Sequence, residues 1–162
     1  MPRDHENDLA TFLKGGERNL DDFLRLGFVR CGTVTSGDSR LIKMEILEAY
    51  AARTRSVYGV FFDERVARIG ARKLDLWGRF TSFQSSVNDR LMNQTGCSDT
   101  PPWEAKAWMA LLGTYGVGVI CSWEPDLVRV DGGRGLLVSP YLSIENALLE
   151  QHRPILNRQW FR

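Results

Sequence analysis

Apolar residues recur at helical spacing in three segments of the first third of the chain. The segments are residues 8–14, 19–26 and 40–52. The apolar stripe of the third segment consists of Ile42, Ile46, Leu47 and Tyr50. Apolar positions three or four apart are typical of an amphipathic helix. The pattern therefore predicts a helical N-terminal extension over residues 1–54.

The period of the pattern changes to two after Arg55. Residues 56–62 read SVYGVFF and residues 66–70 read VARIG, and both runs are rich in β-branched or aromatic residues. Two such runs separated by a few polar residues predict a β-hairpin. Helical spacing returns over residues 74–92 and predicts a longer helix. Its apolar positions are Leu76, Phe80, Phe83, Val87 and Leu91.

The remaining elements follow a turn-rich segment. A proline at a first helical position begins a helix predicted around residues 101–113, and a β-rich run covers residues 115–123. The sequence GLLVS at 135–139 predicts another short strand. A final helix is expected from about residue 140 to 152, with Ser139 as its N-cap and a proline at its first turn.

This order of elements indicates an α+β fold with a small, mostly antiparallel sheet of about three strands flanked by helices. The 162 residues correspond to about one ordinary domain. We therefore expect residues 1–162 to form a single domain. In it, the helical extension over 1–54 precedes the segment 55–162, which contains the hairpin and the later strands and helices.

Charge adds information only when it is counted by segment. The whole chain has 21 basic and 20 acidic residues and a net charge of +1, which points to no polyanionic partner. Residues 51–92, however, hold 8 basic and 4 acidic residues. A locally basic segment is compatible with a surface that faces phosphate groups, although most charged runs are simply solvated faces.

Three further features limit the class of protein. No stretch reaches the roughly 18 apolar residues of a membrane span, and the charged start is unlike a signal peptide, so a cytoplasmic protein without membrane contact is expected. Cys31, Cys97 and Cys121 lack paired spacing and are expected to be reduced structural thiols. His5 and His152 are the only histidines, which excludes a metal site built mainly from imidazole.

Glu145 is the most informative residue of the final predicted helix. It lies on or beside an inward stripe formed by Tyr141, Ile144, Leu148 and His152. A buried carboxylate needs a cation, a set of donors or a metal ion, because burying it alone costs several kcal/mol. Two interpretations stay open, a structural salt bridge to an arginine of the middle segment and a functional carboxylate.

The predicted hairpin places two more polar groups on one face. If its loop has three residues, 63–65, Val60 lies opposite Arg68, and Tyr58 and Arg68 project to the same side of the sheet. A two-residue loop would put them on opposite faces. The register therefore decides whether this tyrosine and this arginine act together.

Several short motifs occur in the order in which the GIY-YIG nucleases carry theirs. The residues SVYG at 56–59 resemble the first motif of that family, and RIG at 68–70 resembles the second. The segment LDLWGR at 74–79 resembles the helix that carries the family's arginine, here Arg79. The resemblance implies a GIY-YIG nuclease fold for this part of the chain.

The segment SIENALLEQHRPILNRQ resembles the closing motif of the family. Glu145 matches the inward glutamate, and Pro154 and Asn157 match the proline and the asparagine that follow it. With this motif the resemblance covers about residues 55–159. It implies that residues 55–162 form the catalytic core and that the helix around 101–113 is an insertion in that core. The chain is similar to the family in the order of its motifs as well as in their content. The resemblance is therefore more specific than a match to any single tripeptide.

The resemblance implies a role for each matched residue. Glu145 is expected to bind one divalent ion, Mg²⁺ with Mn²⁺ as a substitute, because a single carboxylate with several waters suits Mg²⁺. Tyr58 is expected to orient or deprotonate the attacking water. Arg79 is expected to hold the scissile phosphate, and Asn157 to support the site by hydrogen bonding.

Two positions depart from the pattern of the family. Arg68 stands where the second motif usually has a tyrosine, and Phe83 stands where many members have a histidine or tyrosine. A positive charge at position 68 would act near the water or phosphate and lower the pKa of Tyr58. These departures motivate the alternative hypothesis, a nucleic-acid-binding module that has the fold without the cleavage activity.

Basic residues surround the predicted site and would make binding salt-dependent. They are Arg53, Arg55, Arg65, Arg72, Lys73 and Arg90. Of these, Arg55, Arg72, Lys73 and Arg90 are the expected nucleic-acid contacts, and Arg68 is counted with the catalytic residues. The hypothesis favoured by the sequence is a Mg²⁺-dependent endonuclease that cuts double-stranded DNA. A sequence-specific, restriction-type enzyme is one form of this hypothesis. RNA stays open as a substrate, and a palindromic target would call for a homodimer.

Overall fold

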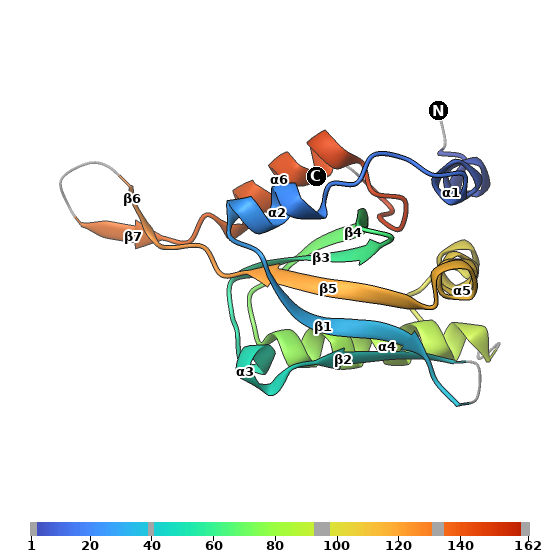
Figure 1. Cartoon of the computed structure of the whole chain (residues 1–162). Helices are drawn as coiled ribbons and strands as arrows, with labels where there is room; N and C mark the ends of the chain where they lie inside the picture. Colours follow the sequence, from blue (N-terminus) through green and yellow to red (C-terminus); the bar gives the residue numbers. More distant parts are fainter. Residues whose placement is uncertain (1–2, 39–40, 93–97, 131–134, 160–162) are drawn as a thin grey trace.

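The computed structural model describes residues 3–38, 41–92, 98–130 and 135–159, and these build an antiparallel sheet of five strands (Figure 1). The strands are β1 (Val29–Ser36), β2 (Ile42–Ile46), β3 (Ser56–Phe62), β4 (Arg65–Arg72) and β5 (Val117–Trp123). Their order across the sheet is β2-β1-β5-β3-β4, with antiparallel pairing throughout. The α+β class is confirmed, whereas the expectation of about three strands is wrong.

Helices cover both faces of this sheet (Figure 1). They are α1 (His5–Leu13), α2 (Leu20–Leu26), α3 (Glu48–Ala51), α4 (Leu76–Leu91), α5 (Pro102–Tyr115) and α6 (Tyr141–His152). Helix α4 lies under one face, whereas α2 and α6 lie over the other. Within the described part of the chain, no helix is long and apolar enough to cross a membrane.

Strand β3 lies between two hydrophobic cores. Tyr58 and Val60 belong to the core that α4 and α5 share with the sheet, whereas Val57 and Phe61 belong to the core beneath α2 and α6. All seven residues of β3 are buried. Alternate side chains of a strand point to opposite faces, so β3 holds the two layers together. Tyr58, the site residue on β3, is therefore attached to a strand that is buried on both faces.

The helix predicted over residues 40–52 is wrong, because the segment contains the strand β2 and only the short helix α3. Ile42 and Met44 are buried against α4, while Lys43 between them is exposed. The backbone of Ile42 exchanges two hydrogen bonds of 3.0 Å with the side-chain amide of Asn88 in α4. Pairing with β1 and packing against α4 thus outweigh the local apolar spacing in deciding the structure of this segment. Only α3 remains helical.

The hairpin of β3 and β4 has the register expected for Tyr58 and Arg68, but its loop differs from the prediction. Val60 pairs with Arg68 as expected. The loop consists of residues 63–64 only, and a β-bulge at Ala67 shifts the register once. Because a bulge adds one residue to one strand, it compensates for the shorter loop. Tyr58 and Arg68 consequently lie on the same side.

The other predicted elements are present with small shifts at their ends. The helices expected over 74–92, 101–113 and 140–152 correspond to α4, α5 and α6, and the strand expected over 115–123 is β5. The N-cap of α6 is the proline that follows Ser139, not Ser139 itself.

The short strand expected over 135–139 is also present, in a second sheet. It is β7 (Leu136–Val138), which pairs with β6 (Val128–Val130) in a hairpin that projects from the body (Figure 1). Residues 131–134, between β6 and β7 in the sequence, lie outside the described residues.

Two of the three cysteines behave as structural thiols. Cys31 and Cys121 are free and buried. Burial raises the pKa of Cys31 to about 11 and that of Cys121 to about 12. A thiol with such a pKa is protonated and unreactive at neutral pH. Cys97 lies outside the described residues.

The strand at residues 42–46 predicts opposite sensitivities at neighbouring positions. Replacing Met44 by Gln places an amide against α4 and should lower the free energy of unfolding by about 1–3 kcal/mol. Replacing the exposed Lys43 by Gln should change it by less than about 0.5 kcal/mol. Urea denaturation of both variants measures the difference. On the helix expected from the apolar stripe, Met44 would face outward, so a neutral Met44→Gln variant would contradict the strand.

Candidate active site

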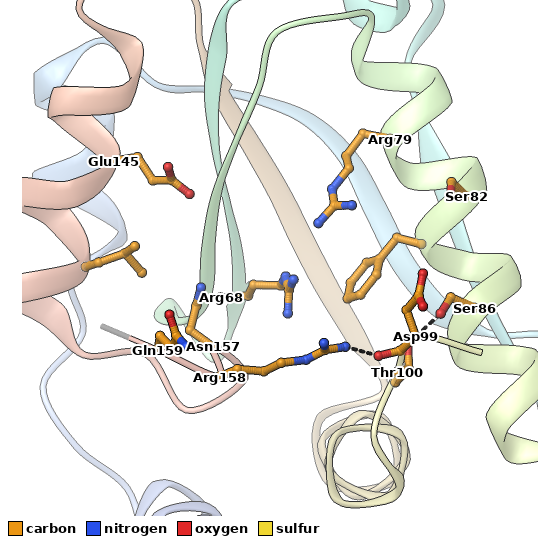
Figure 2. Close-up of a pocket in the computed structure, with 12 residues that line it drawn as sticks. Arg68, Arg79, Ser82, Ser86, Asp99, Thr100, Glu145, Asn157, Arg158 and Gln159 are labelled. Atoms are coloured by element: carbon orange, nitrogen blue, oxygen red, sulfur yellow. Dashed lines mark hydrogen bonds between the residues drawn. The ribbon is translucent and has the colours of Figure 1, made fainter. Parts of the chain in front are cut away.

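A pocket of about 390 Å³ brings together residues that the sequence placed in separate motifs (Figure 2). Arg68 from β4, Arg79 from α4, Glu145 from α6 and Asn157 from the segment after α6 all line it. Tyr58 adjoins them, because the Nε atom of Arg79 donates a 3.0 Å hydrogen bond to its hydroxyl oxygen. All five predicted catalytic residues are therefore close neighbours in the fold.

Tyr58 reaches this place by crossing the neighbouring strand. Its side chain is buried and packs edge-on against Phe80, with 4.9 Å between the ring centroids. Gly70 is its pairing partner on β4, and a Cβ atom at that position would lie 2.3 Å from the Tyr58 hydroxyl oxygen. The glycine of the RIG segment thus provides the space that the tyrosine ring occupies.

Two guanidinium groups act on the ionisation of Tyr58. Burial alone would raise the pKa of this hydroxyl, but the positive charges of Arg68 and Arg79 and their hydrogen bonding outweigh burial. The pKa of Tyr58 is therefore lowered, in the direction expected from an arginine at position 68. A lower pKa makes the phenolate, which accepts protons, available nearer to neutral pH.

Arg68 is held on several sides as it enters the pocket. Its Nη1 atom donates hydrogen bonds to the Oε1 atom of Glu104 at 2.6 Å and to the carbonyl oxygen of Leu156 at 3.0 Å. Burial opposes its charge, but the neighbouring Tyr58 and Glu104 raise the pKa of Arg68 above the usual arginine value. Arg68 is consequently a permanent positive charge in the site.

Phe83 contacts both arginines. The guanidinium carbon of Arg68 is 4.3 Å from the centre of its ring, and that of Arg79 is 5.4 Å away. An aromatic face attracts cations. The phenylalanine that departs from the family pattern thus offers a surface to both guanidinium groups, a role that needs no exchangeable proton.

Glu145 is buried on the inward face of α6, as its position in the sequence predicted. It points from the helix into the pocket towards Arg79 (Figure 2). Within the described ranges, no group of three or more histidine, cysteine, aspartate or glutamate side chains could hold a metal ion. Two carboxylates, those of Glu145 and Asp99, line this polar pocket. Such a small set of protein donors fits an ion that keeps most of its water ligands, such as Mg²⁺.

Asn157 connects the segment after α6 to the sheet. Its side-chain oxygen accepts a hydrogen bond from the backbone N–H of Ile69 at 2.9 Å, and its side-chain nitrogen donates to the carbonyl oxygen of Ile69 at 2.6 Å. The amide thereby binds both polar groups of one residue on β4. Because Ile69 lies between Arg68 and Gly70, this pair of bonds fixes the strand where it carries site residues.

Sequence reasoning missed Glu104, which is fully buried in α5 and contacts Arg68. A signal was present, because Glu104 shares one helix face with Trp108 and Leu111, four and seven residues further on. The same spacing identified Glu145. Asp99 and Thr100 were also missed as part of the pocket. The Thr100 hydroxyl lies 2.8 Å from that of Ser86, which lines the pocket too.

The residues expected to contact nucleic acid differ in the exposure and the hydrogen bonding of their side chains. Arg55 and Lys73 are exposed and adjoin each other, because the backbone N–H of Arg55 donates to the carbonyl oxygen of Lys73 at 3.1 Å. Arg72 is partly buried. Arg90 donates to the carbonyl oxygens of Thr100, at 2.8 Å, and Ser98, at 3.2 Å, and so holds the wall of the pocket.

Two arginines expected to flank the site instead bind within the protein. Arg53 donates to the carbonyl oxygen of Ser122 at 3.0 Å. Arg65 is buried and donates at 2.6 Å both to the carbonyl oxygen of Phe12 and to the hydroxyl of Tyr115. Their charges are used in packing α1, α5 and β5, so neither belongs to the surface around the pocket.

The sheet, its helices and the pocket define a fold that occurs among endonucleases. The structure is similar to that of a mutant of bacteriophage T4 EndoII, with a TM-score of 0.63 and 11% identity over 87% of this chain and 99% of that chain. It is also similar to restriction endonuclease HPY188I in complex with product DNA, with a TM-score of 0.52 and 17% identity over 87% of this chain and 82% of that chain. No protein-family model and no curated protein matches the sequence.

The environment of Tyr58 predicts a measurable titration. In an ultraviolet difference titration of wild type against Tyr58→Phe, the missing tyrosine should have a pKa below 10, the ordinary value for tyrosine. Replacing Arg79 by Gln removes one positive charge and one hydrogen bond, so the pKa of Tyr58 should rise. An unchanged pKa in Arg79→Gln would show that Arg79 does not control this hydroxyl.

Proposed function

We propose that this chain is a metal-dependent DNA endonuclease of the GIY-YIG type, which hydrolyses phosphodiester bonds. The observation that carries the proposal is that Arg79 and Glu145 line one pocket and that Tyr58 lies beside it, hydrogen-bonded to Arg79, although the three come from different elements of the fold. These residues come from separate motifs of the sequence. Their meeting on a fold shared with bacteriophage T4 EndoII and restriction endonuclease HPY188I supports phosphodiester cleavage.

Each residue of the pocket has a task in such a reaction. Tyr58, with its lowered pKa, orients the attacking water and accepts its proton. Arg79 uses its Nε atom on Tyr58, and its other nitrogen atoms are available to bind the phosphate and neutralise its growing charge. Glu145 would hold Mg²⁺, or Mn²⁺ in its place, which supplies Lewis-acid stabilisation of the phosphate when bound. Asn157 keeps β4 in position.

The substrate that this site fits is double-stranded DNA, in keeping with the product DNA bound to restriction endonuclease HPY188I. Arg55 and Lys73 would contact its backbone on the exposed side, and Arg72 and Arg90 would contribute closer to the pocket. Residues 1–162 would act as one domain in a restriction-type role. A palindromic target would require a two-fold homodimer, because each copy has one such pocket among its described residues.

Cleavage of supercoiled plasmid DNA tests the proposal directly. Wild-type protein should cut the plasmid with Mg²⁺ or Mn²⁺ and should stop when a chelator is added. Glu145→Gln keeps the shape of the side chain but removes its charge, so the rate should fall at least about 100-fold, the order of loss for one group that stabilises transition-state charge. Glu150→Gln changes an exposed glutamate on the same helix and should cut at the wild-type rate.

The unfolding temperatures of both variants show whether the loss comes from the site or from the fold. Undiminished cutting by a folded Glu145→Gln variant would contradict the assignment of Glu145. Binding that survives the chelator, without cleavage with any divalent ion, would instead establish a nucleic-acid-binding module. Sequencing the cut ends distinguishes nicking from cleavage of both strands and reveals any sequence preference.

DNA binding should depend on salt through a few exposed residues. Fluorescence anisotropy with Glu145→Gln, which avoids cleavage, measures the affinity at several salt concentrations. Arg55→Ala and Lys73→Ala should each weaken binding and reduce the slope of log K against log salt by about 0.9, the value for one lost phosphate contact. Lys43→Ala removes an exposed charge from the far edge of the sheet and serves as the control. Equal slopes in all variants would show that the DNA binds to another surface of the protein.

A further inference from the structure

A buried ion pair lies behind the pocket and joins α5 to β4. Glu104 is fully buried, and its Oε1 atom accepts the 2.6 Å hydrogen bond from Nη1 of Arg68. Its other oxygen, Oε2, lies 3.9 Å from Nη2 of Arg158 and accepts no hydrogen bond from the part of the chain that the structure describes. One arginine is thus bound firmly and the other only at long range.

Stability alone does not account for this pair. Removing two charges from water has a large desolvation cost, and a buried ion pair is often no more stabilising than apolar residues of the same volume. Helix α5 is also attached by other means. Its Trp108 ring packs edge-on against Phe83, at 5.5 Å between centroids, and against Phe62, at 6.0 Å. The helix would therefore stay in place without an ionic contact.

The contacts of Glu104 form a closed loop around the arginine. Glu104 binds Arg68, the guanidinium of Arg68 stacks on Phe83, and Phe83 packs against Trp108, which lies one turn after Glu104 on α5. Because each member contacts the next, Arg68 cannot swing towards the solvent without breaking its bond to Glu104. The loop leaves Arg68 turned towards the pocket, which it lines.

We propose that Glu104 is a positioning residue, which fixes the guanidinium of Arg68 beside the Tyr58 hydroxyl and against the pocket that binds the reacting phosphate. This inference rests on the proposed nuclease function. It assigns to α5, the helix inserted in the core, the control of a charge that the site uses. Glu104 itself lies behind Arg68 and acts through it.

The charged groups around Tyr58 come from four elements. Arg68 on β4 and Arg79 on α4 are those that act on its ionisation. Glu145 on α6, and Asp99 and Arg158 from the segments before α5 and after α6, line the same pocket. Glu104 on α5 can affect Tyr58 in two ways, by its own negative charge or by holding Arg68 in place. The two effects have opposite signs when Glu104 is removed, which allows an experiment to separate them.

The first experiment measures the pKa of Tyr58 in two variants of Glu104, by difference titration against the same variants carrying Tyr58→Phe. Glu104→Ala releases Arg68, so the pKa of Tyr58 should rise towards its ordinary value, and the acidic limb of the pH–rate profile for plasmid cleavage should move to higher pH with it. Glu104→Gln still accepts a hydrogen bond from Arg68 and should leave the pKa at or below that of wild type.

Two results of this experiment would overturn the inference. An unchanged or lower pKa of Tyr58 in Glu104→Ala would mean that Arg68 stays in place without Glu104. Equal upward shifts in the Ala and Gln variants would mean that the hydrogen bond does not position Arg68. The titration needs no DNA cleavage, so it tests Glu104 even if the wild-type protein cuts nothing, a result that would refute the proposed function alone.

A second comparison covers the case in which Glu104→Ala does not fold, because that variant leaves the charge of Arg68 buried. The double variant Arg68→Met/Glu104→Leu replaces both charges by apolar side chains and should fold. Its cleavage rate should fall about 100-fold, as expected for the loss of one charge that acts on the phosphate. Cleavage at the wild-type rate would show that the pair is only structural and would overturn the inference.

Discussion

The buried hydroxyl of Tyr58 is the constraint on which the arrangement of the pocket depends. A phenol in a protein core needs a hydrogen-bonding partner, and here Arg79 donates to it at 3.0 Å. The ring can reach that partner only because Gly70 has no Cβ atom. A second cation, Arg68, then needs its own anion, which Glu104 provides. Each requirement is met by a different element, so the site exists only in the assembled fold.

Most of the elements in the second half of the chain could be predicted because their apolar periods are local. Helices α4, α5 and α6 and strands β3 to β5 each have one clear period, and the structure contains all of them. The helical extension expected over residues 1–54 was wrong at residues 29–46, which contain β1 and β2, because the structure of these residues depends on distant parts of the chain. The partners of β1 include β5, and α4 supplies the side chains that bind β2. Spacing within a short segment carries no information about such partners.

The site was predictable to the extent that its residues lie in ordered motifs or on inward helix faces. Tyr58, Arg79 and Glu145 were identified in that way, and they lie together. The common face of Tyr58 and Arg68 was correct although the loop was not, since nothing local in the sequence marks the bulge that restores the register. The functions of the basic residues were the least predictable, because a charge in the sequence does not reveal which way the side chain points.

The described structure leaves neither edge of the sheet bare. On β2, the backbone N–H groups of Ile42 and Met44 donate to side chains of α4. On β4, the carbonyl oxygen of Ala67 accepts from the backbone of Leu156, and both backbone polar groups of Ile69 are bound by Asn157. Exposed strand edges invite pairing with other chains, and covering them is a recognised protection against aggregation. Direct strand pairing between the central sheets of two copies of this chain is therefore disfavoured.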